Sequence, residues 1–140
     1  MANSTPVKTR PAAEPARPAS MMAVIAPAAG WLLPGAGHII QKRWIRGLLL
    51  LVSIGSLFVL GLMMQGHIYK PNGGDILDIL GFIGDLGAGG MYITTLAMNW
   101  GQGAIAFAIA DYGTKFMIVA GLLNFIAMAD AYHIAIGKKR

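Results

Sequence analysis

The chain has 140 residues, of which 56% are hydrophobic and only 12% charged, and its formal net charge is +5. A single soluble domain of this length cannot bury so much apolar surface, so the composition predicts an integral membrane protein. The sequence contains no Cys, which excludes disulfides, thiolate metal sites and cysteine nucleophiles.

The N-terminal stretch and the first hydrophobic segment differ sharply in composition. Residues 1–20 are rich in Ala, Pro, Ser and Thr, so we expect a disordered tail. The apolar segment that follows contains Pro27 and Pro34 and cannot form one straight helix. We predict a helix over residues 21–33 that ends at Pro34, in a helical membrane domain covering 21–140. Because this helix is shorter than the ~20 residues needed to cross a bilayer, we expect it to be re-entrant or tilted.

A corner of small residues joins the first segment to the second. Its structural residues are Pro34, Gly35, Gly37 and Gly47. Cations and a tryptophan, which suit a membrane interface, precede the second segment: Lys42, Arg43, Trp44 and Arg46. The uncharged run over 47–65 then predicts a membrane-spanning helix.

The third segment, 76–98, predicts an amphipathic helix after a turn-rich loop over 66–75. Asp78 and Asp85 share one face with Gly81, and we expect this face to point inward. The glycine-rich run over 87–90 predicts a kink or the close approach of another helix.

The last segment predicts a second clear span, with a helix over 115–137. We expect a turn over 111–114 and an N-terminal cap at Thr114. Asn124 and Asp130 lie inside this apolar helix, about 120° apart around its axis. The chain then continues with cations that predict a membrane-surface anchor: Lys138, Lys139 and Arg140.

Two topologies fit these segments. Four full spans place the 42–46 cations outside, whereas two full spans with 21–40 and 76–98 re-entrant place every basic cluster in the cytoplasm. We predict an all-α integral membrane bundle of about four embedded helices, two of them certain spans, with both termini cytoplasmic.

Part of the sequence resembles known families. The run from Pro34 to Gly47 resembles the glycine-rich corner of the two-transmembrane-helix domain family, although His38, Ile39 and Ile40 replace the triplet usual there. The region 30–140 is similar to a family of small uncharacterised bacterial integral-membrane proteins. That resemblance implies the bacterial inner membrane and carries no activity.

The intramembrane polar residues are the main candidates for a functional site: Asp78, Asp85, Asn124 and Asp130. Such groups mark either a polar path or a structural hydrogen-bond network, and we favour the structural role. We interpret the three histidines, His38, His67 and His133, as interfacial residues, because none has a partner at helical spacing. The alternative is metal or haem ligation, if the fold brings two of them together. The sequence indicates no catalytic, cofactor or metal site.

These observations favour a small structural or accessory membrane protein, either homo-oligomeric or part of a larger complex. The alternative is a minimal oligomeric transporter or channel that uses the intramembrane Asp and Asn residues. We expect the lipid bilayer as a partner and no nucleic acid, because the cations cluster beside apolar runs.

Overall fold

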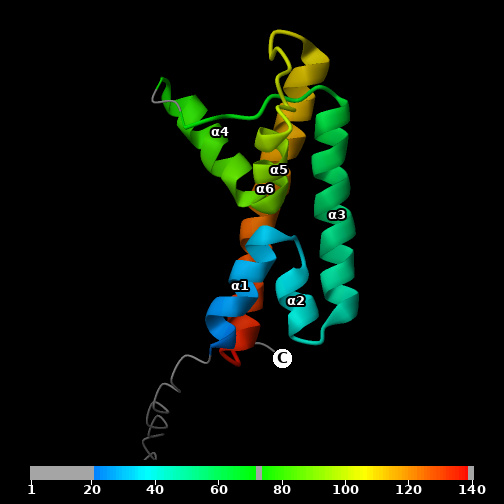
Figure 1. Ribbon diagram of the computed structural model, residues 1–140, viewed down its shortest axis with the longest axis vertical. Helices are drawn as coiled ribbons and strands as arrows, with labels where there is room; N and C mark the ends of the chain where they lie inside the picture. The colour runs from blue at the N-terminus through cyan, green and yellow to red at the C-terminus, as the bar shows by residue number, and fades with distance from the viewer. Residues whose placement is uncertain (1–20, 72–73, 139–140) are drawn as a thin grey trace, which may run out of the picture.

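The computed structural model describes residues 21–71 and 74–138, and this part of the chain forms six α-helices without a β-strand. The expected disordered tail and the anchor residues Lys139 and Arg140 lie outside the described residues. Figure 1 shows the helices, which are α1 (Met22–Leu32), α2 (Ala36–Ile40), α3 (Trp44–Met63), α4 (Ile76–Gly87), α5 (Gly90–Ala97) and α6 (Ala108–Ala135). The predicted all-α class is confirmed.

Helices α3 and α6 are the two that are long and apolar enough to cross a membrane. They lie side by side with opposite directions (Figure 1). Their backbones nearly touch where Gly61 meets Gly113, since a Cβ atom on either glycine would lie 2.6 Å from the other's carbonyl oxygen. Small residues permit such close packing in membranes. By length and composition, both predicted spans are confirmed.

Helices α1 and α2 form a half-length hairpin beside α6. Leu33 is extended (φ −137°, ψ 119°), because the following Pro34 disfavours a helical conformation there. Gly35 then takes a left-handed conformation (φ 81°), and α2 returns towards the end from which α1 started (Figure 1). The 11 residues of α1 extend about 16 Å, roughly half of a bilayer's hydrocarbon core. The sequence predicts the end of α1 but not the separate helix α2.

Helices α4 and α5 form a second half-length hairpin that enters from the opposite end of the molecule. The two helices are bent by 110° at the break between them, where Gly89 has φ 55°. The segment that leads into α4 and the segment that follows α5 lie beside each other near the end of α3, because the backbone N–H of Ile68 donates to the carbonyl oxygen of Gly101 (2.9 Å). The predicted kink over 87–90 is confirmed, and it divides the segment into two helices.

The two hairpins meet near the middle of the molecule. A Cβ atom on Gly89 would collide with the carbonyl oxygen of Trp31, and one on Gly90 would collide with that of Leu32. The end of α1 therefore lies directly against the start of α5. Placed end to end, these two helices have 11 and eight residues and would extend about 28 Å, close to the ~30 Å hydrocarbon core. Two distant parts of the chain thus pack against each other through the ends of short helices.

The start of α6 differs from the sequence-based prediction. We expect a turn over 111–114 and a helix from 115, but α6 begins at Ala108 and includes the expected turn. The Thr114 hydroxyl donates to the carbonyl oxygen of Ala110 (2.7 Å), so it does not cap a helix start. Lys115 pairs with Asp111 at 2.7 Å, one helical turn away. These turn-forming residue types are accommodated because their side chains bond within the helix.

Candidate functional site

Asn124, on α6, lies where the half-length helices end. Its side chain is fully buried, and its Nδ2 atom donates to the carbonyl oxygen of Gly87 at 2.9 Å and, more weakly, to that of Trp31 at 3.5 Å. The Trp31 indole Nε1 donates to the carbonyl oxygen of Leu86 at 2.9 Å. We call this group, Trp31, Leu86, Gly87, Gly89 and Asn124, the central junction. It joins the ends of α1 and α4 to the middle of α6.

The central junction addresses a general problem of helix ends in lipid. The last four carbonyl groups of a helix have no partner within that helix, and an unpaired group in hydrocarbon costs several kcal/mol. Asn124 and Trp31 supply N–H donors to carbonyls at the ends of α1 and α4. The Oδ1 atom of Asn124 has no hydrogen-bond partner among the described residues. Within the described residues, the side-chain amide of Asn124 therefore donates hydrogen bonds but accepts none.

Asp85 is also fully buried, on the inner face of α4. Its Oδ2 atom accepts a hydrogen bond from the backbone N–H of Tyr69 (2.8 Å), while Oδ1 has no partner within the described part of the chain. The Tyr92 hydroxyl donates to the carbonyl oxygen of the same Tyr69 (3.0 Å). Asp85 and Tyr92 thus hold the segment that follows α3 against the second hairpin.

Neither Asn124 nor a serine of α3 is the hydrogen-bond partner of Asp85. Asn124 is occupied at the central junction. Ser53 and Ser56 are exposed on α3, and the Ser56 hydroxyl donates to the carbonyl oxygen of Ser53 (3.1 Å). The true partner is a backbone N–H group in a connecting segment, which helical periodicity cannot identify.

A third polar cluster lies at the end of the molecule where α2 meets α3, which we call the basic end because Lys42, Arg43, Arg46 and Lys138 lie there. His38 Nε2 lies 3.1 Å from Asp130 Oδ2, and Arg46 Nη1 lies 3.3 Å from the same oxygen. Gln41 Nε2 donates to the carbonyl oxygen of Ala131 at 3.0 Å. These contacts fasten the first hairpin to the end of α6.

The interpretation of His38 as an interfacial residue is wrong, because its side chain is only 1% exposed. His38 and Asp130 are 92 positions apart, and nothing in the spacing of the sequence links them. The other two histidines are half-buried, and His67 Nδ1 lies 3.1 Å from the carbonyl oxygen of Gly103. The spacing of the sequence therefore does not identify His38 or Gln41 as a member of this cluster.

The four predicted intramembrane polar residues do not converge on one site. Asp78 is half-buried in the first turn of α4, and Asp85 binds the backbone of Tyr69. Asn124 belongs to the central junction, whereas Asp130 belongs to the basic end. No group of three or more His, Cys, Asp or Glu side chains in the described ranges could hold a metal ion. The arrangement therefore favours separate structural contacts.

The predicted corner does converge in space. A Cβ atom on Gly35 would collide with the carbonyl oxygen of Gly47, and one on Gly37 would collide with that of Ala26. Pro34 is buried beside them. These small residues allow the first hairpin and the start of α3 to pack backbone against backbone.

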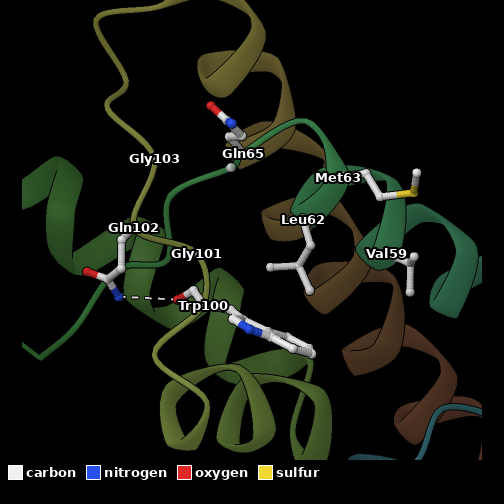
Figure 2. Close-up of a pocket in the computed structure, with 9 residues that line it drawn as sticks. Val59, Leu62, Met63, Gln65, Trp100, Gly101, Gln102 and Gly103 are labelled. Carbon is white, nitrogen blue, oxygen red and sulfur yellow. Dashed lines mark hydrogen bonds between the residues drawn. The ribbon is translucent and has the colours of Figure 1, made fainter.

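An apolar pocket of about 600 Å³ lies at the opposite end of the molecule, between the end of α3 and the segment after α5. Its lining residues are Val59, Leu62, Met63, Gln65, Gly66, Trp100, Gly101, Gln102 and Gly103. Figure 2 shows the Trp100 indole near Leu62, with the amide groups of Gln65 and Gln102 directed away from them. Gln102 Nε2 instead donates to the carbonyl oxygen of Trp100 (3.2 Å). The pocket thus suits hydrocarbon rather than a polar substrate.

Comparison with known proteins places the chain in one family. No curated protein and no solved structure matches the sequence. The model of a family of unknown function, DUF6677, matches residues 25–140, which include all the helical contacts described above except those of the first three residues of α1. The chain belongs to the DUF6677 family of unknown function.

Proposed function

We propose that the protein is a non-catalytic structural or accessory component of a membrane, acting as a homo-oligomer or within a larger membrane complex. The observation that carries this proposal is that the buried polar side chains bind other parts of the same chain. Asn124 binds helix ends, Asp85 binds a connecting segment, and His38 binds Asp130. Each of these contacts holds a half-length helix in place, as expected of groups that stabilise a scaffold.

The surface supports a role that depends on apolar contacts. The outer face of α4 exposes a row of large aliphatic side chains, Ile76, Leu77, Ile79, Leu80 and Ile83. Figure 1 shows α4 leaning away from α3. Lipid or the apolar helix of another subunit can cover such a face without loss of hydrogen bonds.

We further propose that the protein lies in a bacterial inner membrane with both termini in the cytoplasm. The described end of α6 and the start of α1 lie at the same end of the molecule as Lys42, Arg43 and Arg46 (Figure 1). Cations near spanning helices concentrate on the cytoplasmic side. Because the chain has no Cys, single cysteines can test this orientation. An impermeant thiol reagent should label Lys70→Cys in intact cells and Lys138→Cys only after permeabilisation, and the reverse pattern contradicts the proposal.

A transporter or channel is the second candidate, and one observation favours it. Two half-length hairpins enter from opposite ends and meet at the central junction, where Asn124 Oδ1 has no partner among the described residues. Transporters place discontinuous helices and their ion sites near the middle of the membrane. This candidate requires an oligomer, because two full spans and two hairpins hardly enclose a path.

One purification discriminates between the two candidates. The protein is extracted in mild detergent, its mass is determined by native mass spectrometry, and the same sample is reconstituted into liposomes. A stable assembly without ion or proton flux supports the structural proposal. Flux that is present in the wild type and lost in Asn124→Leu, with the variant folded, overturns the structural proposal in favour of transport.

A further inference from the structure

A second, smaller pocket lies at the basic end, at the corner between α2 and α3. It has a volume of about 370 Å³ and is lined by Lys42, Arg43, Trp44, Ile45 and Arg46. Three of the five lining side chains are cationic and none is acidic. Lys42 and Arg43 form no ion pair within the described residues, whereas Arg46 lies 3.3 Å from Asp130. The pocket therefore has an excess of positive charge.

The first turn of α3 adds to this positive potential. The helix begins at Trp44, has no side-chain cap at Arg43, and carries no acidic residue in its first turn. The first backbone N–H groups of a helix lack partners within it, and the helix dipole places partial positive charge at this end. Together with the cationic side chains, these groups favour an anion such as a phosphate.

The backbone of Lys42 ends α2 in a left-handed conformation, which determines how the residue can be tested. Its φ of 61° lies in the left-handed region, at the position where glycine commonly ends a helix. The backbone N–H of Lys42 donates to Ile39 and that of Arg43 to His38, as this helix-ending motif requires. Gly137 takes the same position after α6, with φ 75°. Gln65 after α3 and Asn99 after α5 take this position too, and any of these side chains strains the backbone more than glycine would. A glycine at position 42 should therefore preserve the fold while it removes the cation.

We propose that the corner formed by residues 42–46 binds the phosphate group of an anionic membrane lipid. The source of the phosphate follows from the position of the pocket at the start of a helix that is long enough to span a membrane. Trp44 and Ile45 beside the cations are 66% and 80% exposed, so they can contact acyl chains while Lys42 and Arg43 contact the headgroup. A free phosphate would gain nothing from these apolar neighbours.

Lys42→Gly separates a binding role from a structural one. The substitution relieves the left-handed strain, so the thermal midpoint in detergent should rise. The loss of one cation beside the membrane surface should weaken retention of the lipid about fivefold. Gln65→Gly is the matched control, because Gln65 has φ 58° in the same helix-ending motif after α3. This control should also raise the midpoint but leave lipid retention unchanged.

Native mass spectrometry measures the binding directly, with phosphatidylglycerol and phosphatidylcholine as probes. The wild type should retain phosphatidylglycerol in preference to phosphatidylcholine, and Lys42→Gly should reduce this preference about fivefold. Equal retention of the two lipids by the wild type, or unchanged preference in Lys42→Gly, overturns the proposal. If inorganic phosphate raises the midpoint of the wild type but not of Lys42→Gly, and no lipid is retained, the corner binds free phosphate and the lipid assignment is wrong.

Discussion

Substitution of Gly89 by alanine tests the contact between the two hairpins. Gly89 begins the turn into α5, and a Cβ atom at this position would collide with the carbonyl oxygen of Trp31 at the end of α1. Neither group can yield by a side-chain rotation, because the obstructing atom belongs to the backbone. We therefore expect Gly89→Ala to separate α1 from α5 or to prevent their assembly.

Two terms contribute to the expected loss of stability. The positive φ of 55° costs an alanine roughly 1–2 kcal/mol relative to glycine. Forcing a methyl group into a close-packed contact costs about 1–3 kcal/mol more. The free energy of unfolding should therefore fall by about 2–5 kcal/mol, a large part of the stability of a small protein.

Denaturant titration in detergent micelles, followed by circular dichroism, measures this difference. Gly55→Ala on α3 is the matched control, since no atom lies within 4 Å of the added Cβ. That control should leave the protein equally stable or slightly more stable, because alanine favours a helix over glycine. If Gly89→Ala unfolds at the same denaturant concentration as Gly55→Ala, α1 and α5 do not pack as described.

The other predictions concern single polar contacts. Asp85→Asn should be tolerated because its amide oxygen can accept from the N–H of Tyr69, whereas Asp85→Leu leaves that donor unpaired and should lower the free energy of unfolding by about 1–3 kcal/mol, measured by the same titration. His38→Ala should destabilise by more than Arg46→Ala, since His38 is buried and Arg46 is 46% exposed; equal losses would contradict this. Thr114→Val should lower the free energy of unfolding by about 1 kcal/mol, because it removes the hydroxyl that accepts a hydrogen bond from the backbone N–H of His67. Thr114→Ser keeps this hydroxyl and should leave the stability unchanged.

Much of the fold follows from the sequence because membrane helices have strong local signals. The apolar lengths of the second and last segments identify both spans, and Pro34 fixes the end of α1 through its effect on Leu33. The glycine-rich run over 87–90 identifies the break in the third segment. The early start of α6 escapes prediction because Gly113 lies against the carbonyl oxygen of Gly61, a tertiary contact that overrides the local turn preference.

The candidate site follows from the sequence only in part. Asp85 is recognisable because it shares a helix face with glycines, and Asn124 because an amide inside a long apolar helix needs a partner. Their actual partners are backbone groups of Tyr69 and Gly87, and every residue type carries such groups, so the sequence does not identify them. The pairing of His38 with Asp130 depends on how the first hairpin folds back beside α6, and no periodicity encodes that path.

The meeting of α1 with α5 has a consequence for the order of events during biosynthesis. The ribosome completes α1 long before Gly89, Gly90 and Asn124 are translated, so at first the end of α1 lacks the contacts that enclose its last carbonyl groups. Unpaired backbone groups are unfavourable in apolar surroundings, so the end of α1 is less stable before these contacts form. The contacts of this hairpin with α5 and α6 are therefore complete only after α6 has left the ribosome. A chain truncated after α3 would contain one of the two full spans, but its first hairpin would lack its contacts with α5 and α6.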